Sequence, residues 1–156
     1  MKKILVTGGA GYIGSHMVLQ LQAAGYAVVV LDNFSGGHQA SVSGAVCVEG
    51  NCGDAAVLQA LFKAHRFDAV MHFAGFIQVG ESVEDPAKYY LNNVSGTLNL
   101  LQAMLRWKVN RFIFSSTAAA KSFSNCNWKP KRYYGKNFCQ KRRRAKPGTH
   151  LSPNWL

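Results

Sequence analysis

Apolar positions in the N-terminal three quarters of the chain alternate between short continuous runs and longer stretches with apolar residues every three or four positions. Five apolar runs are typical of strands buried on both faces; they occupy residues 4–6, 27–31, 45–48, 69–73 and 111–115. The longer stretches predict helices over residues 12–24, 54–65 and 86–107. Gly25 supplies a helix stop, Asp54 an N-cap, and Pro86 a first-turn position that tolerates proline.

The alternation of strands and helices determines the expected fold. Parallel strands need a crossover connection, and these helices are placed to supply one each time. Right-handed crossovers then give an α/β fold with a doubly wound parallel sheet. Because ligands of such sheets bind at the carboxyl ends of the strands, residues 73–75 and 115–117 are expected near the site.

Composition fits one domain with a buried core, since 48% of the 156 residues are hydrophobic and 16% are charged. The four cysteines form no Cys-x-x-Cys pair, so neither a disulfide scaffold nor a zinc or other metal site is expected. No uncharged apolar run reaches the ~18–20 residues of a membrane helix, and nothing resembles a secretion signal. We therefore expect a cytoplasmic protein that does not interact with membranes.

The charge divides the chain in two. Residues 1–119 hold 8 Lys+Arg and 7 Asp+Glu, whereas residues 120–156 hold 10 Lys+Arg and no acidic residue. The formal net charge of +11 therefore belongs almost entirely to the last 37 residues. We predict a domain over residues 1–119 and an irregular or disordered basic tail over residues 120–156.

A glycine motif follows the first strand and precedes the first helix. Gly8, Gly11 and Gly14 have the spacing of a dinucleotide-binding loop, in which they allow a tight turn, the approach of a pyrophosphate, and close packing of the helix. Asp32 ends the second strand, where a carboxylate binds ribose hydroxyls and repels a 2′-phosphate, which favours NAD over NADP. The alternative is a glycine turn that only joins a strand to a helix.

The motifs also carry a family resemblance. Residues 7–16 (TGGAGYIGSH) resemble the start of an extended short-chain dehydrogenase/reductase of the NAD-dependent epimerase/dehydratase type. Five later segments closely resemble the UDP-glucose 4-epimerases: VMHFAG at 70–75, VGES at 79–82, YYLNNV at 89–94, GTL at 96–98 and FIFSSTA at 112–118. The resemblance runs from Met1 to about Ala119, so the Rossmann fold that it implies is expected to be truncated at its C-terminal side.

The resemblance implies a set of contacts to NAD. It places the pyrophosphate on Gly8, Gly11, Tyr12, Ile13 and Gly14, and the adenosine ribose on Asp32, Asn33 and Ser35. Asp54 would lie beside the adenine, in addition to capping its helix, and Phe73, Ala74, Gly75 and Asn92 would line the rest of the cofactor. Thr117 matches the residue that binds the sugar 4-hydroxyl, and Ile77 stands where the family often has a lysine.

The implied reaction interconverts UDP-glucose and UDP-galactose, in a family of homodimers. NAD⁺ takes a hydride from C4 of the UDP-sugar while a tyrosine, assisted by a lysine four residues later, removes the hydroxyl proton. None of the six tyrosines has a lysine four residues later, and the expected tyrosine position falls near Arg142, which cannot act as a base. We therefore expect an NAD-binding fragment without epimerase turnover.

The basic tail allows three interpretations. Its abrupt onset inside a family motif is what a reading-frame change would produce. It could instead be an inert, solvated tail. The third interpretation is a non-enzymatic binding module, in which the run Lys141 to Arg144 neutralises nucleic-acid phosphates and Trp128 and other aromatic residues stack on bases.

Overall fold

The computed structural model describes residues 1–115, and Thr117 and the predicted tail over 120–156 lie outside this range. Five parallel strands form one sheet in the order β3-β2-β1-β4-β5. Their bounds are Lys3–Thr7 for β1, Ala27–Asp32 for β2, Val46–Glu49 for β3, Ala69–His72 for β4 and Phe112–Phe114 for β5. This is the strand order of the doubly wound Rossmann fold, so the predicted fold class is confirmed.

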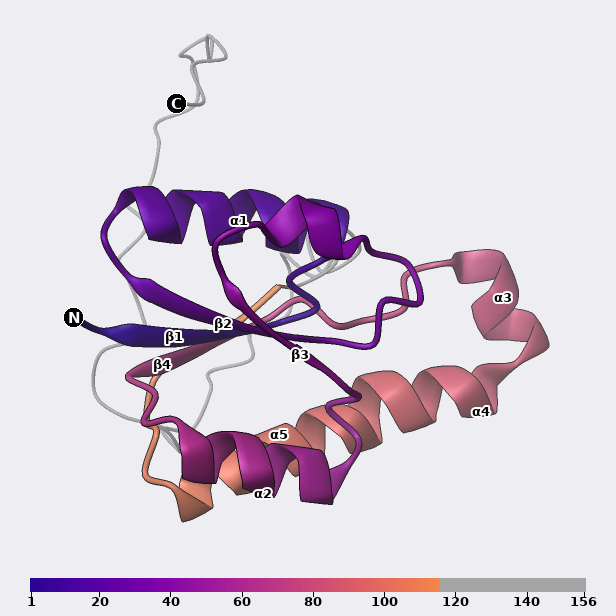
Figure 1. Cartoon of the computed structure of the whole chain (residues 1–156). Coiled ribbons are helices and arrows are strands. Elements are labelled where there is room, and N and C mark those ends of the chain that lie inside the picture. The colour runs from indigo at the N-terminus through magenta and orange to yellow at the C-terminus, as the bar shows by residue number, and fades with distance from the viewer. Residues whose placement is uncertain (116–156) are drawn as a thin grey trace, which may run out of the picture.

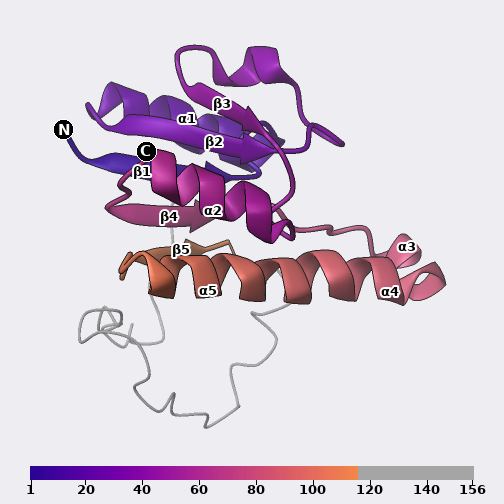
Figure 2. The ribbon, with the colours of Figure 1, turned by 60° about the horizontal axis from the view of Figure 1, so that its bottom comes forward.

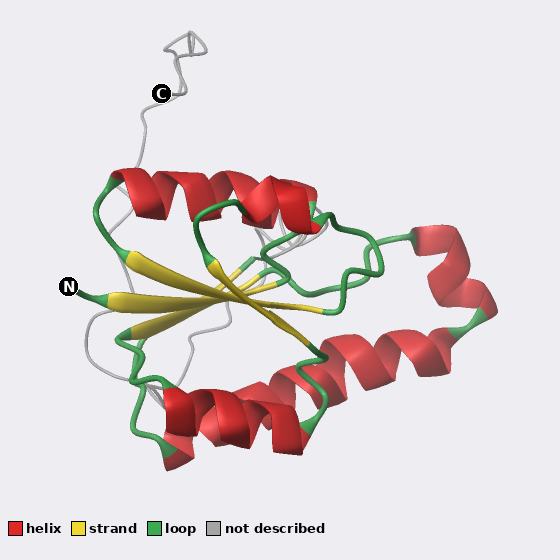
Figure 3. Ribbon diagram, in the orientation of Figure 1, coloured by secondary structure: helices red, strands yellow, loops and turns green. Residues whose placement is uncertain are grey.

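Helices cover both faces of the sheet (Figure 1). Helix α1 (Tyr12–Ala23) and the short 3₁₀ helix η1 (Gln39–Val42) lie on one face, and α2 (Ala55–Ala64) and α5 (Thr97–Arg106) lie on the other. Figure 3 shows the resulting three layers, with the sheet between the helices. No helix among residues 1–115 is long and apolar enough to cross a membrane.

The strands are buried on both sides, which explains their continuous apolar runs. Leu5 and Val29 point into a core cluster beneath α2 and α5, together with Phe62 and Leu100. Alternate residues of the same strands, such as Val6, point into a second cluster on the other face of the sheet. Between their end residues the central strands are therefore apolar at every position, as a two-sided parallel sheet requires.

The region predicted as one helix over residues 86–107 is more complex. Three consecutive helical segments form one continuous rod there: α4 (Pro86–Tyr89), a π-helical turn η2 (Tyr90–Gly96) and α5. A further short helix, α3 (Val79–Glu84), precedes the rod, and Figure 2 shows α3 and α4 extending past the carboxyl ends of the strands. The helical prediction is correct in extent, but the sequence pattern missed the π turn, α3 and η1.

The remaining differences are small shifts at element ends. Strand β3 lies one residue later than predicted, because it pairs with β2 up to the Asp32–Glu49 position. Strands β4 and β5 end one residue earlier than predicted. None of these shifts moves a loop from the carboxyl edge of the sheet, which is where the candidate site lies.

Candidate cofactor site

The glycine loop begins where β1 ends, at the carboxyl edge of the sheet. Gly8 has a positive φ of +70°, which a residue with a side chain rarely adopts. Its N–H donates to the Leu31 carbonyl at 2.9 Å, and a Cβ on Gly8 would lie 2.5 Å from the backbone nitrogen of Ala74. The loop is therefore pressed between the ends of β2 and β4, and only glycine fits at this position.

Steric crowding around the backbone differs between Gly14 and Gly11. A Cβ on Gly14 would lie 2.2 Å from the Gly8 carbonyl oxygen and 2.8 Å from Gly9 Cα, so α1 could not approach the loop as it does. A Cβ on Gly11 would meet only the Gly8 oxygen, at an ordinary 3.5 Å. Packing explains the glycine at position 14, and it does not explain the glycine at position 11.

Asp32 ties the end of β2 to the glycine loop. Its carboxylate is buried and accepts hydrogen bonds from the Ala10 N–H at 2.8 Å and from the Phe34 N–H at 2.9 Å. Just beyond it, Asn33 Oδ1 accepts from both the N–H and the hydroxyl of Ser35, at 3.1 and 2.8 Å. The three predicted ribose contacts therefore lie together at the end of β2, with Asn33 and Ser35 exposed.

Three other predicted contacts lie at helix N-termini. The side chains of Tyr12 and Ile13 are exposed in the first turn of α1, and the backbone N–H groups of such a turn have no intrahelical acceptors. Asp54 is the N-cap of α2 and accepts from the N–H groups of Ala56 and Val57, at 2.8 and 3.3 Å. The predicted cap is confirmed, while the contact of Asp54 with adenine stays a prediction.

The loop after β4 runs beside the glycine loop. The Phe73 N–H donates to the Thr7 carbonyl at 2.8 Å, and the Gly75 N–H donates to the Phe73 carbonyl at 2.9 Å. From the π turn, Asn92 Nδ2 donates to the Ala74 carbonyl at 3.3 Å. The structure thus places Phe73 and Ala74 against Gly8, with Gly75 and Asn92 bonded to these two residues.

A hydrogen-bonded chain lies behind the site and passes through His72. The Thr97 hydroxyl donates its single hydrogen to the Asn93 carbonyl at 2.7 Å, so it accepts from His72 Nε2, 3.1 Å away. His72 Nδ1 is then the unprotonated nitrogen and accepts from the Thr7 hydroxyl at 2.6 Å. Burial lowers the pKa of His72 to about 4, so the imidazole in this chain is neutral at neutral pH.

Sequence reasoning missed two residues of this arrangement. Asn93 and Thr97 both belong to the motifs YYLNNV and GTL, yet only Asn92 was given a role there. A signal was present in the sequence. Asn92 and Asn93 are adjacent polar residues in a predicted amphipathic helix, and α-helical spacing would not place two adjacent side chains on one face. Thr117, the predicted contact to the sugar, lies outside the described residues.

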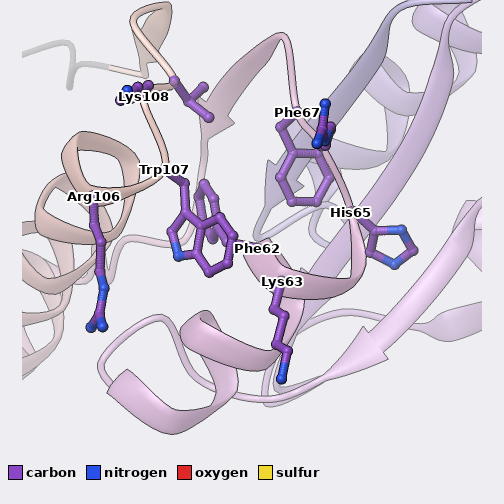
Figure 4. Close-up of a pocket in the computed structure, with 9 residues that line it drawn as sticks. Phe62, Lys63, His65, Phe67, Arg106, Trp107 and Lys108 are labelled. Carbon is purple, nitrogen blue, oxygen red and sulfur yellow. The ribbon is translucent and has the colours of Figure 1, made fainter.

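A cavity also lies away from this site. It has a volume of about 460 Å³ and lies between the C-terminal ends of α2 and α5, at the amino edge of the sheet (Figure 4). Its aromatic lining includes Phe62 and Trp107, and its charged lining residues are all basic, such as Lys63 and Arg106. Lys63 and Arg106 lie in the last turns of α2 and α5, where a positive charge stabilises the helix dipole. Within residues 1–115 no group of His, Cys, Asp and Glu could hold a metal ion.

Comparison with known proteins identifies extensive similarity. A family model described as the NAD dependent epimerase/dehydratase family matches residues 4–136. The UDP-glucose 4-epimerase of Rhizobium meliloti (strain 1021) is 53% identical over 116 residues, which are 74% of this chain and 35% of the relative. The mouse enzyme of the same name is 47% identical over 132 residues, covering 76% of this chain and 38% of that relative.

Solved structures agree with this similarity. The crystal structure of UDP-glucose 4-epimerase from Brucella ovis in complex with NAD has a TM-score of 0.74 and 50% identity, and the match covers 76% of this chain and 37% of that one. The enzyme from Bifidobacterium longum in complex with NAD⁺ and UDP has a TM-score of 0.71 and 38% identity, with 75% and 37% covered. The chain thus spans about a third of the length of the relatives that it matches.

Proposed function

The chain belongs to the NAD-dependent epimerase/dehydratase family, and from this premise we propose that it binds NAD at the carboxyl edge of the sheet. The observation that carries this proposal is the glycine at position 11. A methyl group there would meet one atom at ordinary contact distance, so the fold does not need a glycine. A phosphate approaching the first turn of α1 does need one, because a Cβ would occupy part of its space.

The surrounding groups suit the two halves of the cofactor. The N-terminus of α1 offers unpaired N–H groups and the positive end of the helix dipole to the pyrophosphate. The Asp32 carboxylate uses one lone pair of each oxygen on a backbone N–H, which leaves capacity for the ribose hydroxyls. When bound, NAD supplies hydride acceptance, and this chain's residues hold and orient it.

We expect Asp32 to exclude NADP, because its carboxylate would face the 2′-phosphate of that cofactor at close range. NADP should bind at least about tenfold more weakly than NAD, since like charges brought together at an interface are strongly unfavourable. In Asp32→Asn the difference should fall to about threefold or less. The same change should lower the free energy of unfolding by about 2 kcal/mol, because one backbone N–H loses its charged acceptor.

Isothermal titration calorimetry of the full chain with NAD and NADP measures both affinities. Glu84→Gln is the matched control, since it removes an exposed carboxylate of α3 that accepts no hydrogen bond in the described part of the chain. Equal affinity of the unmodified chain for NAD and NADP would contradict the role of Asp32. An unchanged preference in Asp32→Asn would contradict it equally.

The relatives are named UDP-glucose 4-epimerases. We propose that this chain holds the cofactor without epimerase turnover. No tyrosine of the 156 residues is followed by a lysine four positions later, so the paired base is absent from this sequence. An assay of UDP-glucose formation from UDP-galactose, at saturating NAD, should give no product above the protein-free control. Product formation would show that another residue acts as the base.

A second candidate function is favoured by charge alone. The 10 basic residues and no acidic residue of 120–156 are the composition of a polyanion-binding segment. Binding to RNA or DNA that weakens steeply with salt, and that is lost on deletion of residues 120–156, would support this function. NAD binding without nucleic-acid binding at low salt would leave only the cofactor function.

A further inference from the structure

The π turn η2 interrupts a rod that is otherwise α-helical, beside the loop after β4, residues 73–76, which we call the cofactor loop. π-helical hydrogen bonds join residues five apart, so the chain turns through a smaller angle per residue than in an α-helix. Such turns are rare in proteins overall, and those that occur are often found at functional sites. In η2 the smaller angle allows two adjacent side chains, Asn92 and Asn93, to face the same loop.

Asn93 makes the more complete contact of the two. Its Oδ1 accepts from the Phe76 N–H at 2.9 Å, and its Nδ2 donates to the Phe76 carbonyl at 2.9 Å. One side-chain amide thereby satisfies both backbone groups of one loop residue, as a neighbouring strand would. Asn92 Nδ2 also donates to Asn93 Oδ1 at 2.9 Å, which fixes the orientation of the Asn93 amide.

The side chain of Phe76 is held by the same rod. Its ring lies 5.5 Å from the ring of Tyr89, and the ammonium group of Lys88 lies 5.1 Å from its centroid. The Tyr89 hydroxyl donates to Glu81 at 2.7 Å, and Lys88 forms an ion pair with Glu81. The end of the cofactor loop is therefore attached to α4 and η2 through both backbone and side chains.

The other side of η2 is fixed to the sheet. Thr97 donates to the Asn93 carbonyl and accepts from His72, which in turn accepts from Thr7 at the end of β1. At its start the cofactor loop is fixed by the Phe73 N–H bond to Thr7. Residues 74–76 thus span two fixed points, β1 and the Asn93 amide.

We propose that Asn93 is a positioning residue that holds residues 74–76 in the conformation that lines the nicotinamide half of NAD. The inference rests on the proposed cofactor site. Asn93 acts through the backbone of Phe76, so it does not itself need to touch the cofactor. An amide is required because the position needs one donor and one acceptor, which a carboxylate or an alkyl group cannot supply.

The test compares two ligands that share one half. ADP carries the adenosine and the pyrophosphate, whereas NAD adds the nicotinamide riboside that would lie along residues 74–76. In Asn93→Ala the affinity for NAD should fall about tenfold, the size expected for losing well-formed hydrogen bonds. The affinity for ADP should change less than about twofold, because its contacts lie on the glycine loop and the end of β2. Calorimetry of the full chain measures both.

Gln22→Ala is the matched control, because Gln22 Nε2 also donates to a backbone carbonyl, that of Ser43, from the C-terminal half of α1. It should leave both affinities unchanged. Asn93→Gln keeps a donor and an acceptor on a longer side chain, so it keeps the proposal testable if Asn93→Ala does not fold. It should give an NAD affinity between those of Asn93→Ala and the unmodified chain.

The possible outcomes separate the two proposals. Equal losses of NAD and ADP affinity in a folded Asn93→Ala would mean that Asn93 is merely structural, and unchanged NAD affinity would mean that the loop does not need it. Either result overturns the positioning role and leaves the cofactor site intact. Failure of the unmodified chain to bind NAD would overturn the proposed function and this inference with it.

Discussion

Gly14→Ala should destabilise the chain severely, whereas Gly11→Ala should leave its stability almost unchanged and weaken NAD binding at least about tenfold. The new methyl group at position 14 would lie 2.2 Å from the Gly8 oxygen and 2.8 Å from Gly9 Cα, both backbone atoms that no side-chain rotation can move. Such overpacking costs about 3 kcal/mol or more. This is a large share of the ~5–15 kcal/mol that stabilises a typical domain.

The methyl group at position 11 meets no such obstacle. Gly11 has φ −71° and ψ 172°, which alanine adopts readily, and its Cβ would be 3.5 Å from the Gly8 oxygen. Gly11 is the N-cap of α1, and alanine is a weaker N-cap, so we expect a loss of less than about 1 kcal/mol. The affinity for NAD should fall at least about tenfold, because the methyl group blocks the approach of the pyrophosphate.

Urea unfolding followed by circular dichroism measures the stability of both variants, and calorimetry measures NAD binding. The two substitutions add the same methyl group three residues apart, so each is the control for the other. Unchanged NAD affinity in a folded Gly11→Ala would mean that no phosphate lies at this turn. A stable Gly14→Ala would mean that α1 does not pack as closely on the loop as the structure shows.

Acid should destabilise the chain through His72. The imidazole is buried between Thr7 and Thr97, and burial lowers its pKa from the ordinary 6.5 to about 4. Between these two values the unfolded chain binds the proton and the folded chain does not, so stability falls as the pH falls through this window. The full loss is about 3 kcal/mol, and it is complete below pH 4, where both states are protonated.

The contribution of His72 is isolated by a difference between variants, because several carboxylates also titrate in acid. The free energy of unfolding of the full chain should fall more steeply between pH 6.5 and 4 than that of His72→Gln, because glutamine at position 72 does not titrate. His38→Gln, at an exposed position of the loop after β2, should behave as the unmodified chain. Parallel curves for the unmodified chain and His72→Gln would contradict the buried neutral imidazole.

The fold was predictable where burial alone determines the structure. The central strands are apolar between their end residues because Leu5 and Val6 face different cores, and that pattern can be recognised without any tertiary information. The N-cap of α2 was predictable for a similar reason, because Asp54 bonds only to the first turn of its own helix. The short helices α3 and η1 were missed because six and four residues are too few to show a helical period.

The site was only partly predictable, because its shape depends on contacts between distant segments. The spacing of Gly8, Gly11 and Gly14 predicted the loop, but only the structure separates the two that packing requires from the one that it does not. The bond from Asp32 to the Ala10 N–H joins residues 22 apart. The π turn likewise depends on Thr97 and Asn93 and on their partners in β4 and its loop, which no local pattern contains.

The central claim is that NAD binds at the carboxyl edge of the sheet, and hydrogen exchange of the full chain with and without NAD tests it most directly. We predict that NAD slows exchange in residues 8–15, 32–35 and 73–76, and that it leaves residues 62–67 and 106–109, which line the amino-edge cavity, unchanged. Slowed exchange at the amino-edge cavity instead, or no change in either region of a folded chain, would contradict the account.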